Sequence, residues 1–142
     1  MKYDKHELYR LECRVEVYLE DILGMELYGP FNIERYEGKK NKYYIKVRAS
    51  TYPKTPKQII KQFEDALGIK GVKLYTERKD GKYREYYICD VTRDDLCKWD
   101  SMFKMMGFDK YGHNIHYRIL AEKQKESIHL LNNKLLHKSS RV

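Results

Sequence analysis

Residues 72–91 have the sequence VKLYTERKDGKYREYYICDV, and this stretch decides the fold. Alternating segments flank Asp80-Gly81, and an Asp-Gly pair in that setting is among the strongest sequence signals for a β-hairpin with a tight turn. This turn would place three pairs opposite each other: Lys79 and Lys82, Glu77 and Arg84, Tyr75 and Tyr86. Opposite charges and paired aromatic rings stabilise neighbouring strands, so the register predicts a hairpin with a charged, tyrosine-rich face.

An earlier segment predicts a second hairpin, with strands over residues 31–36 and 43–49 and a polar turn over residues 37–42. Both strands alternate between apolar and polar residues, as half-buried strands do. One face would carry Ile33, Ile45 and Val47. The other would carry Glu34, Tyr36, Tyr44, Lys46 and Arg48.

Helical periodicity fills most of the remaining chain. The first helix is expected over residues 4–23, with Asp4 as its cap and an inward stripe of Leu8, Leu11, Val15, Tyr18, Leu19 and Ile22. Thr55-Pro56 opens a second helix to Leu67, and Thr92 caps a third to Met106. A fourth is expected over residues 115–137, with a narrow apolar seam of Ile119, Leu120, Ile128, Leu131 and Leu135.

The predicted order is helix, β-hairpin, helix, β-hairpin, helix, helix. Two hairpin-plus-helix units, residues 31–67 and 72–107, suggest a four-stranded antiparallel sheet with helices packed on one face, which is an α+β fold. We expect residues 1–142 to form a single domain that ends in a short basic tail, residues 138–142.

The charge of the chain is polarised. Its net charge is +8, and residues 32–90 alone carry +7 whereas residues 1–31 carry −3. A positive surface attracts phosphates or acidic proteins. The three cysteines form no Cys-x-x-Cys pair, and no apolar run approaches the roughly 18 residues of a membrane span. These features predict a cytoplasmic protein with no membrane partner.

No catalytic signature, cofactor motif or complete metal-ligand set is evident, so the expectation is a non-enzymatic protein without cofactor or metal. Cys97, His113 and His116 could meet at a metal only with a fourth ligand that the sequence does not supply. Glu12, Glu16 and Glu20 line one side of the first helix, where a solvated face is the commonest explanation. Gly68-Ile69-Lys70-Gly71 matches an RNA-clamping loop pattern, but a helix end followed by a turn explains it better.

The order and spacing of elements over residues 8–107 resemble the core of the LAGLIDADG homing-endonuclease domain, including the entry Gly29-Pro30-Phe31-Asn32-Ile33 into the first strand. The family places an acidic metal ligand just before that glycine. Tyr28 stands there in this chain, and Glu26 lies nearby. The resemblance therefore implies a related fold without the family's acidic motif.

The candidate binding residues are basic side chains interleaved with tyrosines: Tyr36, Lys39, Lys40, Lys42, Tyr44, Lys46, Arg48, Lys79, Lys82, Arg84 and Tyr86. Exposed rings on a sheet can stack bases while lysine and arginine meet phosphates, which predicts a nucleic-acid-binding protein. The alternatives are an inhibitor or regulator that binds an acidic surface of a protein or ribonucleoprotein, of the kind found in phages or mobile elements, and a homing-endonuclease-like domain. The C-terminal helix could pair two copies of the chain.

Overall fold

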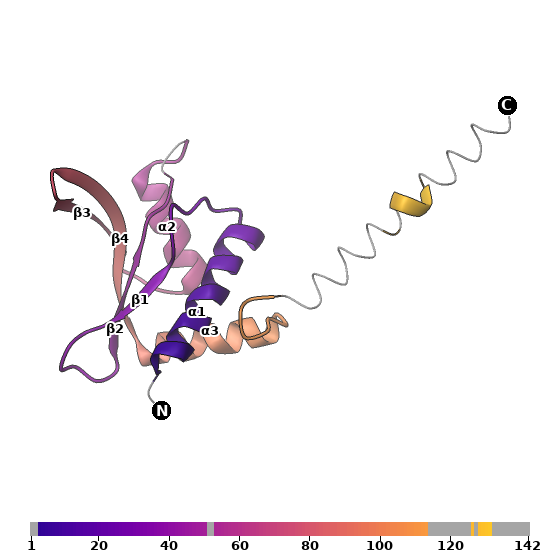
Figure 1. Cartoon of the computed structure of the whole chain (residues 1–142), viewed down its shortest axis with the longest axis horizontal. Coiled ribbons are helices and arrows are strands. Elements are labelled where there is room, and N and C mark those ends of the chain that lie inside the picture. Colours follow the sequence, from indigo (N-terminus) through magenta and orange to yellow (C-terminus); the bar gives the residue numbers. More distant parts are fainter. Residues whose placement is uncertain (1–2, 51–52, 114–125, 127, 132–142) are drawn as a thin grey trace, which may run out of the picture.

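The computed structural model describes residues 3–50, 53–113, 126 and 128–131, and the elements up to Met105 form a sheet covered by helices (Figure 1). The elements follow one another in the predicted order. They are α1 (Lys5–Val17), η1 (Tyr18–Ile22), β1 (Asn32–Arg35), β2 (Lys42–Val47), α2 (Pro56–Leu67), β3 (Lys73–Lys79), β4 (Lys82–Thr92) and α3 (Arg93–Met105).

The sheet has four antiparallel strands in the order β1-β2-β4-β3. The predicted register of the second hairpin is confirmed, with Glu77 opposite Arg84 and Tyr75 opposite Tyr86. Asp80 and Gly81 have φ values of 54° and 73°, as the favoured two-residue hairpin turn requires. The two hairpins join through β2 and β4, where Ile45 lies opposite Cys89.

One face of the sheet packs against the helices, and Figure 1 shows α1, α2 and α3 on that side. The buried residues of this face alternate along the strands: Ile33, Tyr43, Ile45, Val47, Tyr87, Cys89 and Val91. They form one core with Leu11, Val15, Phe63, Leu96, Trp99 and Phe103 from the helices. The alternate residues of each strand therefore point away from the helices, and we call this side the open face.

The helix starts follow the sequence rules closely. Thr55 and Thr92 each accept a hydrogen bond from the backbone N–H three residues ahead, and Gln58 and Asp95 bond back to the cap residues in return. Such reciprocal capping satisfies amide groups that have no partner inside the helix. At the end of α2, Gly68 takes the left-handed conformation (φ 62°) that lets the chain leave the helix.

The first helix departs from the prediction in its last turn. The residues of η1 form a π-helix, in which each N–H bonds to the carbonyl five residues back instead of four. The wider turn rotates the following residues around the axis, so Leu19 stays fully buried but Ile22 is 38% exposed. The expectation that Ile22 joins the inward stripe was therefore wrong.

The predicted C-terminal helix, residues 115–137, lies mostly outside the described residues. Residue 126 and residues 128–131 are helical, and the side chains of Ile128 and Leu131 are each 60% exposed. The pairing of two copies through this helix stays a prediction. Within the described part of the chain, no helix is long and apolar enough to cross a membrane.

Glutamates of α1 cap the outer edge of the sheet. Glu12 Oε2 accepts a hydrogen bond from the Ile33 N–H, and Glu16 Oε1 accepts one from the Phe31 N–H, each at 2.7 Å. An unpaired edge amide in a partly buried place is costly, so these carboxylates stabilise the entry into β1. Two of the three glutamates that were expected on a solvated helix face, Glu12 and Glu16, therefore have a structural role.

Replacing Glu12 with glutamine is expected to change how stability depends on pH. Burial raises the pKa of Glu12 above its usual value, more than the Ile33 amide lowers it. As pH rises, Glu12 therefore loses its proton at a lower pH in the unfolded chain than in the folded protein. Ionisation of Glu12 thus lowers the free energy of unfolding as pH rises from the unfolded-state pKa to the folded-state pKa. Glu12→Gln keeps an acceptor for the Ile33 N–H but removes the loss of stability that Glu12 causes as pH rises.

Urea unfolding of Glu12→Gln and wild type from about pH 4 to about pH 7.5 should show the variant gaining stability relative to wild type as pH rises. Glu12→Ala removes both the acceptor and the titrating carboxyl, so it should show the same trend but be about 1–3 kcal/mol less stable than Glu12→Gln at every pH. A constant difference between Glu12→Gln and wild type across this range would contradict the assignment.

Candidate nucleic-acid interface

The open face gathers charged and aromatic side chains from all four strands. Its positions alternate with the buried ones, and the pairing of β2 with β4 brings the two hairpins into a single surface. The basic side chains at these positions are Lys42, Lys46, Arg48, Lys73, Lys79, Lys82 and Arg84, and the acidic ones are Glu34, Glu77 and Asp90. Cations outnumber carboxylates there, which favours a polyanionic partner.

The centre of the open face is a network around Lys46. Its Nζ atom lies 3.1 Å from Glu77 Oε2 and 4.3 Å from the centroid of the Tyr86 ring, and the Arg48 guanidinium lies 6.0 Å from the same centroid. Partial burial alone would lower the pKa of Lys46, but the hydrogen bond and charge of Glu77 outweigh it and raise that pKa above its usual value. Lys46 is therefore charged and already paired within the protein.

This network changes the expected role of the tyrosines. The Tyr86 ring is covered by cations, and Tyr36 and Tyr44 pack against each other with centroids 4.9 Å apart. The Tyr36 hydroxyl also donates to Asp90, and this hydrogen bond raises the pKa of Tyr36 to about 12. These rings serve mainly to hold the cations and strands in place. The ring on this face with a large free surface is Tyr75, 47% exposed, which was absent from the predicted set.

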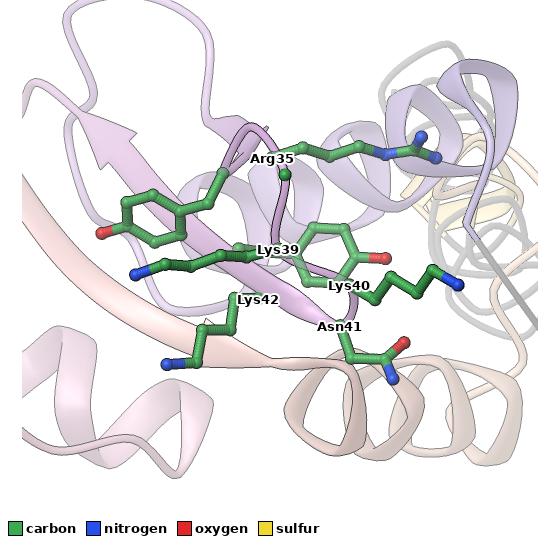
Figure 2. A pocket seen from close by; sticks show the side chains of 8 residues that line it. Arg35, Lys39, Lys40, Asn41 and Lys42 are labelled. Carbon is green, nitrogen blue, oxygen red and sulfur yellow. The ribbon is translucent and has the colours of Figure 1, made fainter.

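The turn between β1 and β2 forms a cationic pocket of about 270 Å³, lined by Arg35, Tyr36, Gly38, Lys39, Lys40, Asn41, Lys42 and Tyr43. No acidic side chain lines this pocket. In the view of Figure 2, Lys39 and Lys42 extend to one side of the turn, and Arg35 and Lys40 extend to the other. Lys39 lies 5.8 Å from the Tyr36 ring centroid, which places it on the side of the open face.

The turn between β3 and β4 borders a second hollow of about 440 Å³, lined by Lys46, Glu77, Lys79, Asp80, Lys82, Arg84 and Tyr86. The register sets this turn at the end of the sheet opposite the first turn, because Lys42 pairs with Thr92 at the far end of β4. With about 3.3 Å per residue, the two basic turns lie roughly 30 Å apart along β4.

The predicted site residues therefore divide into groups. The structure brings Lys46, Arg48 and Tyr86 together at the centre and places Lys39 and Lys42 at one end. At the other end, Lys79, Lys82 and Arg84 line a hollow that reaches Lys46 and Tyr86. Lys40 points away from Lys39 and Lys42. Lys73 was missed, although its register with Ile88 could have identified it. Tyr75 was expected on this face, opposite Tyr86, but was not included among the candidate binding residues.

The other patterns singled out in the sequence lie elsewhere. The Glu64 carboxylate accepts hydrogen bonds from the N–H groups of Gly71 and Val72, so the Gly68–Gly71 segment is a helix end followed by a turn. Cys97 receives a hydrogen bond from Tyr3, and His113 pairs with Asp109 at 3.1 Å, while His116 lies outside the described residues. Among the residues that the structure places, no cluster of three or more suitable side chains could hold a metal ion.

Comparison with family models, with curated proteins and with solved structures finds no match to this chain.

Proposed function

We propose that this protein binds nucleic acid through the open face, with the two basic turns gripping the phosphate backbone at either end. The observation that carries the proposal is the placement of Lys39 and Lys42 at one end of the sheet and Lys79 and Lys82 at the other. A cationic surface of this length suits an extended polyanion better than a small anion.

The chemistry of the cations favours contacts that carry little sequence information. Lysine is a mobile point charge, whereas arginine makes the forked contacts that distinguish base edges. On the open face, the cations that flank the two turns most closely are Lys39, Lys42, Lys79 and Lys82. The arginines of this face, Arg48 and Arg84, lie farther along the strands. Binding should therefore depend on phosphate charge much more than on base sequence.

The test is a titration of the full chain against labelled single- and double-stranded DNA and RNA of about 20 nucleotides, at about 50 and 200 mM salt. Binding that weakens steeply with salt, with little preference among sequences, supports the proposal. No binding at low salt overturns it and leaves an acidic protein surface as the partner to seek. The same samples with magnesium report on nuclease activity, because cleavage would demand an acidic site in place of the missing motif.

Glu77→Gln is expected to tighten binding. The Glu77 carboxylate forms an ion pair with Lys46, which a phosphate would otherwise contact, and it adds a negative charge to the open face. Removing that charge releases one cation for a phosphate contact, which corresponds to an affinity gain of about tenfold at about 50 mM salt. Fluorescence anisotropy with a labelled oligonucleotide measures the change.

Glu85→Gln is the matched control for this prediction. Glu85 lies on the same hairpin, opposite Thr76, and its position alternates with those of the open face. The change in net charge is the same, so an equal gain from both variants would show that only total charge matters. That result would contradict a role for the Lys46–Glu77 pair.

A further inference from the structure

The two outer edges of the sheet differ in whether their outward backbone groups have hydrogen-bond partners. At the β1 edge, Glu16 and Glu12 accept the outward N–H groups of Phe31 and Ile33. The opposite edge is β3, and the hairpin that contains it projects away from the helices in Figure 1. Every described side chain of β3 is exposed except that of Glu77, which is half-buried.

The register identifies the free backbone groups of β3. In a two-residue turn the flanking residues, here Lys79 and Lys82, exchange both hydrogen bonds. Opposed pairs alternate along an antiparallel ladder, so Leu74, Thr76 and Arg78 turn their N–H and C=O groups away from β4. Within the described residues, no backbone group bonds to these three positions from outside the hairpin.

We propose that β3 binds an extended acidic peptide of another protein, which adds to the sheet as a further antiparallel strand. Backbone groups of Leu74, Thr76 and Arg78 would supply the hydrogen bonds, as in other cases of strand addition. The proposal stands independently of nucleic-acid binding, because it uses the edge of the sheet and not the open face.

The charges of β3 indicate which kind of segment would pair with it. On the side of the open face the edge strand carries Lys73 and Lys79, and its one acidic residue, Glu77, is paired with Lys46. Arg78 adds a positive charge on the other side, where it lies 4.6 Å from the centroid of the Tyr83 ring. A second copy of this chain fits poorly, because antiparallel pairing centred on Thr76 would set Lys73 of one copy opposite Lys79 of the other. Edge lysines are a recognised protection against self-association of this kind, and they attract a peptide of opposite charge.

The alternation of β3 also specifies the pattern of the peptide. Residues opposite Lys73 and Lys79 would lie on the side of the open face, where acidic side chains are favoured. Residues opposite Leu74 and Thr76 would lie on the other side, where Leu74 is 37% exposed and Tyr83 is 62% exposed. A peptide that alternates acidic and apolar residues satisfies both sides.

The probe is a capped peptide of about eight residues that alternates glutamate and valine, titrated against the full chain by calorimetry or anisotropy. In the proposed register the valine N–H groups face β3 and the glutamate N–H groups face solvent. Methylation of the valine amides should therefore weaken binding at least about tenfold, whereas methylation of the glutamate amides should leave it nearly unchanged. The corresponding lysine–valine peptide should not bind.

Thr76→Pro tests the same edge from the side of the protein. Its N–H group points outward, so proline removes a bond to the peptide but none to β4, and proline is tolerated at such edge positions. The variant should keep the urea midpoint and the oligonucleotide affinity of wild type and lose peptide binding at least about tenfold. Equal binding of the two methylated peptides, or no binding of the parent peptide, overturns the proposal even if Thr76→Pro fails to fold.

Discussion

The double variant Lys39→Gln/Lys42→Gln is expected to bind a nucleic acid of about 20 nucleotides roughly 200-fold more weakly than wild type at about 50 mM salt. Each lysine that neutralises a phosphate releases condensed counterions, and the slope of log affinity against log salt is about −0.9 for each contact. Removing two contacts should therefore flatten the slope by about 1.8 and reduce the loss to roughly 20-fold at about 200 mM salt.

The matched control comes from the same turn. Arg35 and Lys40 line the same pocket but extend to the other side, so Arg35→Gln/Lys40→Gln removes the same charge from the opposite side (Figure 2). Its loss of affinity should be several times smaller at each salt concentration. Anisotropy titrations of both double variants measure the two losses of affinity. Equal losses would show that the turn acts through its net charge and not through the side chains on the open face.

The second large effect is expected in stability. Trp99 of α3 is 2% exposed, packs edge-on against Phe31 with centroids 6.4 Å apart, and donates its Nε1–H to the Leu67 carbonyl at 2.7 Å. Leu67 is the last residue of α2, where helix carbonyls lack partners within the helix. Trp99 therefore ties α2 to α3 and fills the core, and Trp99→Ala should cost about 3–5 kcal/mol of unfolding free energy.

Trp99→Phe separates the two contributions. Phenylalanine retains most of the apolar burial but leaves the Leu67 carbonyl without its donor, so the expected loss is about 1–3 kcal/mol. Urea unfolding measures both variants. Met105 lies near the end of the same helix and is 89% exposed, so Met105→Ala should stay within about 0.5 kcal/mol of wild type. A Trp99→Ala variant as stable as Met105→Ala would contradict this account of the core.

Local chemistry made much of the fold predictable. The Asp80-Gly81 turn fixed the β3–β4 register because few residues accept a positive φ and the turn leaves only one pairing. Thr55 and Thr92 marked helix starts because a hydroxyl beside the first free amides stabilises them. Neither inference needed knowledge of any distant residue.

The candidate site was predicted only in part. Alternation along β2 placed Tyr44 and Lys46 on one face, and alternation along β4 placed Arg84 and Tyr86 on another. A single sheet with helices on one face was expected, but nothing in the sequence indicated which strands of the two hairpins would be neighbours. Only the pairing of β2 with β4 brings Lys46 over Tyr86 and beside Glu77. Because Lys46 covers the Tyr86 ring, this ring holds a cation in place and is not free to stack on a base.

The sequence by itself determined the type and order of the elements, the hairpin turn at Asp80-Gly81 and the inward residues of most helices, because these depend on backbone preferences and on neighbours a few residues away. The tertiary structure alone decided the strand order, the capping of the β1 edge by Glu12 and Glu16, and the π-turn that exposes Ile22. These features depend on groups far apart in the chain, and their free energy arises only when the whole core is packed.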